Sequence, residues 1–276
     1  MRASARLAAP LLLAVSLAVI GCTPSYRADQ MAAAIKEIAE TEHHFQVSVR
    51  TIGHTIAVHL NHKGVLLQEG NQVSLDPAAN EILGNMIETI HRVVLSSDAK
   101  IDFYLILVSD PSVPGAYLTI VRSLEDVRRA NANVLPPTEF ILCTIFELKF
   151  VGVTMSTIDQ LVLNDIKIEQ FLSWQLAKRI QARLVEELEL HGVPVDVGQC
   201  VGEYKDKEFT FTLNVTAKPE AEFDDETVQQ IFTDATTVIA QVLSGYQFRD
   251  FNQIRLVHPA TGRTLLLPKT RLELFR

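Results

Sequence analysis

Residues 165–191 read DIKIEQFLSWQLAKRIQARLVEELELH, and they form the longest helical pattern in the chain. Their apolar residues recur at intervals of three and four, which places them on one face of a helix. Gly192 and then Pro194 follow, in the order that ends a helix. The apolar positions are Ile168, Phe171, Leu172, Leu176, Ile180, Leu184 and Leu188. The sequence therefore predicts a long central helix at 165–191 with one buried face.

On either side of this helix the same order of patterns occurs: strand, helix, strand, turn, strand. The first copy covers about 54–122 and the second about 208–267. In each copy an acidic residue opens the helix, and a turn rich in Pro or Gly joins the last two strands. These signals are Asp76-Pro77 and residues 110–115 in the first copy, and Asp224-Asp225 and residues 259–262 in the second. They predict an α+β fold with two βαββ-like units, mixed or antiparallel sheets and a long central helix. The two copies are either a structural repeat or two examples of a common α+β arrangement.

Several further segments complete the expected architecture. Residues 28–40 predict a short packing helix, and the period-two run 45–60 predicts a strand or a hairpin bent at Gly53. Residues 63–71 are expected to form a loop. Residues 140–151 and 158–163 predict strands. The pair Pro136-Pro137 indicates a boundary between an N-terminal unit at 28–135 and a C-terminal unit at 136–276.

The composition is that of a packed globular body, with 47% hydrophobic and 21% charged residues. The formal net charge is −8. An acidic balance argues against nucleic acid as a partner, because basic side chains supply most of that affinity. It also argues against a polybasic contact with anionic lipid.

The N-terminus has the layout of a secretory signal peptide. Arg2 and Arg6 precede an apolar run at 7–20, and no acidic residue occurs there. A membrane-spanning helix needs about 20 apolar residues, so this shorter run, interrupted by Pro10, favours a cleaved signal over a permanent span. The run ends in Val19-Ile20-Gly21-Cys22.

This ending resembles the lipobox of bacterial lipoproteins. The resemblance implies cleavage after Gly21, a diacylglycerol thioether on Cys22 and acylation, for example with palmitate, of the new amino terminus. Residues 1–21 would then be the signal peptide and 22–27 a short lipidated tether. Thr23 stands where Asp retains such proteins at the inner membrane of Gram-negative bacteria, so the resemblance favours the outer membrane, facing the periplasm. No family resemblance is found beyond these residues.

Two further cysteines, Cys143 and Cys200, leave two alternatives open. An exported chain meets an oxidising compartment, where an even number of cysteines permits a disulfide between them. Alternatively both are buried free thiols, because Cys143 lies in an apolar run. No C-x-x-C motif is present to indicate a redox or zinc site.

Five of the eight histidines fall between residues 43 and 62, which raises the question of a metal site. In a strand, His54 and His59 would point to opposite faces, and no carboxylate stands at a diagnostic spacing. Nucleophile, phosphate-loop and metalloprotease motifs are likewise absent from the sequence. No catalytic, cofactor-binding or metal-ligating residue is therefore predicted. The five histidines are His43, His44, His54, His59 and His62.

These features predict a lipid-anchored envelope protein with a structural or interaction role rather than an enzyme. Its expected partners are the bilayer, through acylated Cys22, and an envelope protein. The central helix, which carries Trp174, is one partner surface to consider, although its apolar stripe fits a core more simply. One alternative is a carrier of a small ligand or a metal, with a pocket between the two units. The other is a hydrolase with unrecognised residues.

Overall fold

The computed structural model describes residues 25–70, 72–150, 164–219 and 221–272. The signal peptide, the lipobox with Cys22 and Thr23, and the strand expected at 158–163 lie outside the described residues. Within the described residues, no helix is long and apolar enough to cross a membrane.

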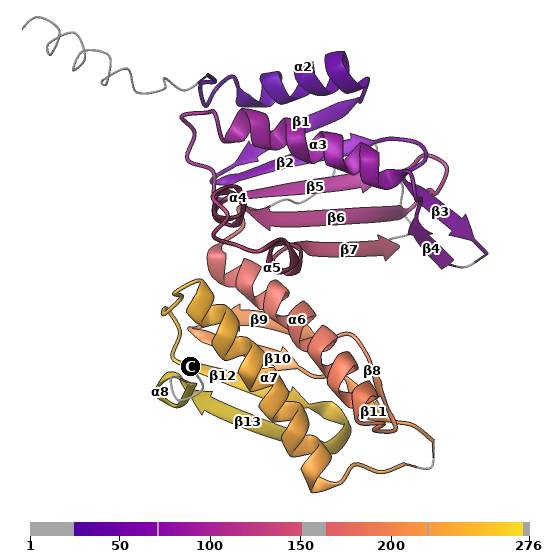
Figure 1. Ribbon diagram of the computed structural model, residues 1–276, viewed down its shortest axis with the longest axis vertical. Helices are drawn as coiled ribbons and strands as arrows, with labels where there is room; N and C mark the ends of the chain where they lie inside the picture. The colour runs from indigo at the N-terminus through magenta and orange to yellow at the C-terminus, as the bar shows by residue number, and fades with distance from the viewer. Residues whose placement is uncertain (1–24, 71, 151–163, 220, 273–276) are drawn as a thin grey trace, which may run out of the picture.

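The first unit is a sheet covered on one face by two helices (Figure 1). In chain order its main elements are α2 (Met31–His43), β1 (Val47–Ile52), β2 (Thr55–Asn61), α3 (Ala79–Val94), β5 (Phe103–Ser109), β6 (Ala116–Ser123) and β7 (Ile145–Phe150). The strand order is β1-β2-β5-β6-β7. The β2 and β5 strands are parallel because α3 connects them, and the other neighbours are antiparallel.

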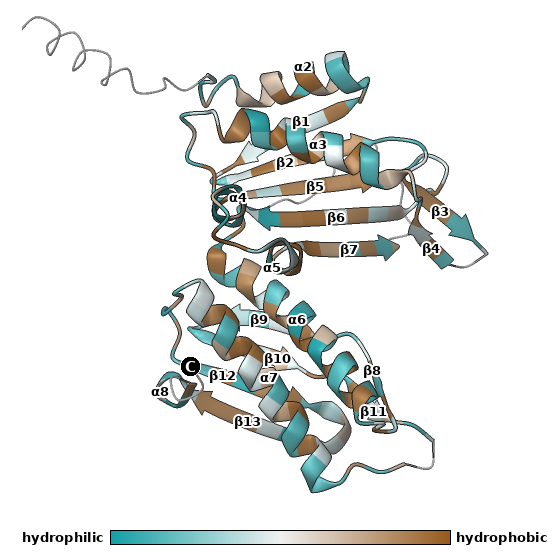
Figure 2. Cartoon of the chain, in the orientation of Figure 1, coloured by the Kyte–Doolittle hydropathy of each residue, from teal (hydrophilic) through white to brown (hydrophobic). Residues whose placement is uncertain are grey.

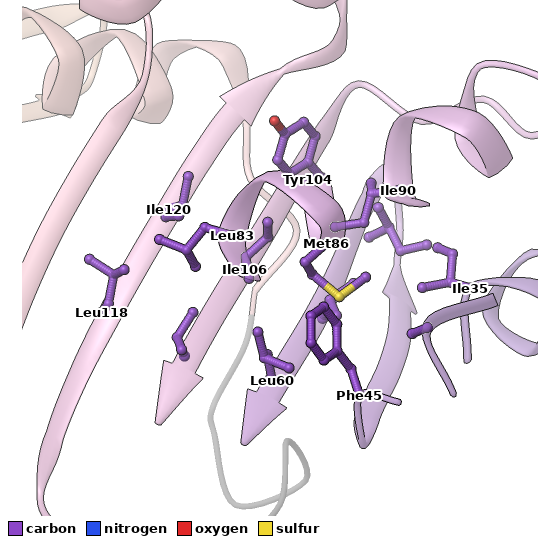
Figure 3. Packing of buried hydrophobic residues seen from close by; sticks show 14 of the residues in the cluster. Ile35, Phe45, Leu60, Leu83, Met86, Ile90, Tyr104, Ile106, Leu118 and Ile120 are labelled. Carbon is purple, nitrogen blue, oxygen red and sulfur yellow. The ribbon is translucent and has the colours of Figure 1, made fainter. Parts of the chain in front are cut away.

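The core of the first unit lies between α2, α3 and alternate residues of the strands. Figure 3 shows Met86 of α3 beside Phe45, with Ile35 of α2 on one side and Leu60 and Ile106 of the sheet on the other. The period-two pattern at 45–60 is confirmed as a hairpin, with Gly53 at φ +56° in its two-residue turn. Near the start of α3, the Asp76 carboxylate accepts the backbone N–H of Ala78 at 2.8 Å.

The second unit repeats this arrangement around the central helix. Its main elements are α6 (Ile168–Leu190), β9 (Val201–Lys205), β10 (Glu208–Thr212), α7 (Asp225–Gly245), β12 (Gln253–His258) and β13 (Arg263–Pro268). The strand order is β13-β12-β10-β9, with β10 parallel to β12 and the other neighbours antiparallel. The α6 and α7 helices cover one face of this sheet, as Figure 1 shows. The expected long central helix, α+β class and two βαββ-like units are confirmed.

Matching backbone hydrogen bonds show how closely the two units correspond. Asp102, which precedes β5, donates its N–H to His54 O and accepts from the N–H of Leu124. Asn252, which precedes β12, donates to Lys207 O and accepts from the N–H of Lys269. His54 and Lys207 each end a two-residue hairpin turn. Leu124 and Lys269 each begin a short helix, α4 (Leu124–Asn131) and α8 (Lys269–Leu272). The two units are therefore a structural repeat of one αββαββ pattern.

Three local expectations differ from the structure. Residues 63–71 were expected to form a loop, but β3 (Leu66–Glu69) pairs with β4 (Gln72–Leu75). The strand expected from Phe140 begins only at Ile145, because Pro137 starts a short helix, α5 (Pro137–Leu142). The alternating pattern of Phe209, Phe211, Leu213 and Val215 predicts one half-buried strand at 208–217, but it is split into β10 and β11 (Val215–Ala217), and β11 leaves the main sheet to pair with β8 (Val195–Val197).

The β7 strand also changes where the first unit ends. It follows the boundary expected at 135/136, yet it pairs with β6 as the fifth strand of the first sheet. The first sheet thus extends to Phe150, and the second unit proper begins with α6. Apolar residues run along β5, β6 and β13 and alternate with polar residues along the helices (Figure 2).

Candidate functional site

An apolar cleft of about 410 Å³ lies between the two units. We call it the inter-unit cleft. Its floor comes from β5, β6 and β7 of the first sheet, on the face opposite α2 and α3. Its walls come from α6 and from β9, the edge strand of the second sheet. A concave site at the junction of two units is where small-molecule and peptide sites commonly occur.

The floor of the inter-unit cleft is apolar and its mouth is charged. Leu105, Val121 and Ile145 form the floor, because odd-numbered residues of these strands face away from the helices. Trp174, the one tryptophan of the chain, stands on the α6 wall. Such a combination suits a partner group with an apolar body and a polar end.

Charged side chains of both signs line the mouth of the cleft. Glu147 and Lys149 of β7 form an ion pair at 3.0 Å, and Lys178 and Glu203 line the opposite wall. Because acids and bases are balanced, the cleft selects for neither a strongly anionic nor a strongly cationic ligand.

The wall formed by β9 depends on one glycine. A Cβ atom on Gly202 would lie 2.2 Å from the backbone oxygen of Ser173 and 2.8 Å from Cε1 of Phe211. Only glycine therefore allows α6 to approach β9 this closely. In the first unit the register places Val49 of β1 at the equivalent position, beneath α2.

A buried polar cluster joins the two units beside the cleft. Tyr246, at the end of α7, donates its hydroxyl to Asp126 of α4, and the Gln175 side chain of α6 donates to Tyr246 Oη at 2.9 Å and to Cys143 O at 3.2 Å. The Asp126 side chain is fully buried, and burial raises the pKa of its carboxyl. One oxygen of Asp126 and one of Gln175 have no hydrogen-bond partner. The junction therefore holds a buried acid, bonded to Tyr246 and 3.7 Å from Arg129 Nη1, in a position that both units enclose.

Apolar contacts support the same junction. The ring of Phe171, in the first turn of α6, lies 5.1 Å from that of Phe103 in β5 and 6.3 Å from that of Tyr246.

A charged contact also joins α6 to the first unit. Arg179 of α6 forms an ion pair with Glu139 of α5. The long helix predicted from the sequence is thus the element that holds the units together.

The clustered histidines do not converge. His54 Nδ1 lies 2.8 Å from Asp102, at the mouth of a separate hollow of about 380 Å³, whereas buried His59 bonds to Ser109 Oγ at 2.8 Å. His43 and His62 both pack against the ring of Phe45. Among the described residues, no three His, Cys, Asp or Glu side chains gather closely enough to hold a metal ion.

The His54–Asp102 pair has the chemistry of a general base, since a carboxylate can orient an imidazole. Sequence reasoning did not identify this pair, because Asp102 is distant in the chain and only the β2–β5 register brings it near His54. The nearby Ser123 hydroxyl accepts the N–H of Glu125 as a helix cap.

Cys143 and Cys200 are both buried free thiols. The disulfide left open by the sequence is not formed, and the other alternative is the one observed. Burial raises the pKa of the Cys143 thiol and raises that of Cys200 to about 11. Both thiols are therefore protonated near neutral pH and are poor nucleophiles, although Cys200 lines the inter-unit cleft.

No protein-family model matches this chain, and a search of curated proteins gives no significant match.

Proposed function

We propose that this chain is a lipid-anchored protein of the bacterial cell envelope that acts by binding a partner protein in its inter-unit cleft, not by catalysis. The observation that carries the proposal is the cleft itself, with an apolar floor, a tryptophan wall and a charged mouth between the two repeats. This geometry suits an apolar segment of an envelope partner.

The location part of the proposal rests on the N-terminal sequence. The run ending in Val19-Ile20-Gly21-Cys22 supports lipidation of Cys22, and Thr23 supports the outer membrane, with the body facing the periplasm. Several acyl chains on one residue give stable anchoring, because each buried methylene contributes about 0.8 kcal/mol. Intact mass of membrane-extracted protein should show loss of residues 1–21 and added acyl chains. An unmodified Cys22 in that material would overturn the location.

The binding part is tested by photo-crosslinking in living cells. A photoreactive residue at Val201, which is exposed on the β9 wall of the cleft, should link to an envelope protein. Leu190, an exposed aliphatic residue at the far end of α6, is the matched control and should not.

The variant Trp174→Ala should abolish the link at Val201, because it removes the apolar wall of the cleft. Equal links at Val201 and Leu190, or a Val201 link that survives Trp174→Ala, would contradict the proposal. Circular dichroism of the variant should match that of the parent chain, which separates lost binding from lost folding.

A small apolar ligand is the second occupant that the same cleft supports. Because Trp174 is the only tryptophan, its fluorescence reports any ligand that enters. A spectrum that shifts on extraction of the purified chain with organic solvent, together with no protein crosslink at Val201, would favour the carrier function.

A further inference from the structure

The outer edge of β13 is the place where the two repeats differ most in strand pairing. In the first unit, β6 pairs on its outer side with β7. In the described part of the chain, the equivalent strand β13 pairs only with β12. Figure 1 places β13 at the side of the molecule away from the first unit. A strand that approaches this edge would therefore not meet the first sheet.

The repeat identifies which residues are left without a neighbour. Leu124 and Lys269 are equivalent, so Val121 corresponds to Leu266 and Thr119 corresponds to Thr264. Val121 pairs with Ile145 of β7 and is 2% exposed, whereas Leu266 is 45% exposed. Part of what covers Val121 is thus missing at Leu266.

The backbone of β13 is also oriented for pairing. The carbonyl of Val257 accepts the N–H of Leu213 on the β10 side, so Val257 directs its groups away from β13. Along the antiparallel ladder, the partner of Val257 is Thr264 and that of Arg255 is Leu266. The N–H and C=O groups of Thr264 and Leu266 consequently point outward from the sheet. Unpaired edges of this kind are templates for another strand.

We propose that the outer edge of β13 pairs antiparallel with β13 of a second copy of this chain, about a two-fold axis at Leu265. In this register Thr264 lies opposite Leu266 of the other copy, so the outward N–H and C=O groups of both residues are all paired. A register centred on Leu266 would place Thr264 opposite Pro268, which has no N–H to donate. The pairing brings Leu265 beside Leu265 of the second copy and makes one sheet from two four-stranded sheets.

The side chains of β13 favour β13 of a second copy of the chain as the strand that pairs with this edge. Residues 264–267 are Thr-Leu-Leu-Leu, so pairing buries apolar side chains on both faces without placing like charges directly opposite. Arg263, at the start of the strand, is already paired with Asp225 of its own chain. An isologous two-fold contact is the commonest form of association between identical chains. A single strand pair buries little area, so the dimer should be weak and concentration-dependent.

Cysteine crosslinking tests the pairing in native membranes that contain the full chain. In a non-hydrogen-bonded antiparallel pair the Cα atoms lie about 4.5 Å apart, within the range that a disulfide requires. Leu265→Cys should therefore give a covalent dimer on a non-reducing gel after treatment with copper phenanthroline. Leu190→Cys, at an exposed site elsewhere, should remain monomeric. A second change, Thr264→Pro, should abolish the Leu265→Cys link because it removes an outward N–H that no described strand of the chain pairs with.

The absence of a Leu265→Cys link, or an equal link at Leu190→Cys, would overturn the proposal. A link at Leu266→Cys but not at Leu265→Cys would overturn the register. Hydrogen exchange of the unmodified chain gives an independent readout. The amides of Thr264 and Leu266 should gain protection as protein concentration rises, while that of Leu265, already paired with Leu256, should not change. Protection that appears only on adding a different protein would show a foreign strand at the edge and overturn self-pairing.

Discussion

The two repeats share one topology but use the second face of their sheets differently. In the first unit the centre of the face opposite the helices is buried, at Ala57, His59 and Phe103. In the second unit the corresponding face is polar and partly open, with Glu208 bonded to Arg255 at 2.7 Å. The centre of this face is therefore shielded in the first unit and open in the second. The same chain pattern can therefore give a shielded or an open sheet face, depending on the residues at alternate strand positions.

The largest expected effect comes from placing a charge on this face in each unit. The register makes Ala57 equivalent to Thr210. Ala57→Lys would bury an unpaired charge at a site that is 1% exposed, and it should cost at least about 4 kcal/mol of unfolding free energy. Thr210→Lys should change it by less than about 1 kcal/mol. Urea unfolding measures both, and equal losses would show that the two faces are equally buried.

A smaller effect is expected from the close approach of α6 to β9. Gly202→Ala forces a methyl group against the backbone of Ser173 and should destabilise the chain by about 3 kcal/mol. Gly84→Ala in α3 is the matched control, because nothing lies within 4 Å of the added atom. That change should instead stabilise the chain by about 0.5–1 kcal/mol, since alanine favours the helix. A Gly202→Ala chain as stable as the parent would refute the tight contact.

Asp126, the buried acid at the junction, should make stability depend on pH, and replacing it should raise the unfolding free energy at pH 7 rather than lower it. Burial raises the pKa of Asp126 in the folded chain above its unfolded value, so the folded state holds the proton more tightly. Its contribution to stability is therefore fully present below the unfolded pKa and is lost as pH rises through the folded pKa.

Asp126→Asn should remove this loss, because the amide stays neutral and can still accept from Tyr246. The variant should be more stable than the parent at pH 7 and close to it at pH 4, as measured by urea unfolding. Asp250→Asn, which changes an exposed acid paired with Lys207, is the control and should not gain stability at pH 7. A parent chain whose stability rises between pH 4 and pH 7, with no such rise in Asp126→Asn, would reverse the assigned sign.

The smallest effect is expected on the open face of the second sheet. Arg255 and Glu208 are partly solvated, and an ion pair of this kind contributes about 0.2–1 kcal/mol. Arg255→Ala should lower the unfolding free energy by no more than that, and 1 M salt should reduce the difference. A loss of several kcal/mol would mean that this face is covered, as it is in the first unit.

Local sequence patterns predict most of the helices and strands, but they do not predict which elements pack or pair with one another in the fold. The three-and-four spacing of 165–191 and the capping acid Asp224 lead directly to α6 and α7, because both signals depend on neighbours in the chain. The apolar run that follows Phe140 was assigned to a strand because short apolar runs have no distinctive period. Pro137 both breaks the preceding chain and starts a helix, and only the second effect places α5 before the strand.

The inter-unit cleft was expected only as a place between the units. Its lining comes from β5, β6, β7, α6 and β9, so no short motif contains it. The polar cluster at the junction was not foreseen for the same reason: Asp126 and Tyr246 are 120 residues apart. Gly202 carried the one local signal, a glycine within a strand pattern, which indicates close approach of another backbone.

The N-terminal segment adds a geometric consequence to the anchor. Ser25 and Tyr26 both donate to Ser96 O, and Asp98 donates back to Tyr26 O, so the body already holds the chain at residue 25. Two residues, Thr23 and Pro24, separate Ser25 from Cys22, so the three Cα–Cα steps between them can span at most about 11 Å. If Cys22 is acylated, as proposed, the segment between Cys22 and Ser25 is too short for the folded body to rotate freely above the bilayer. The anchor would then fix the orientation of the protein as well as its location, because the same side of the first unit would face the membrane in every copy.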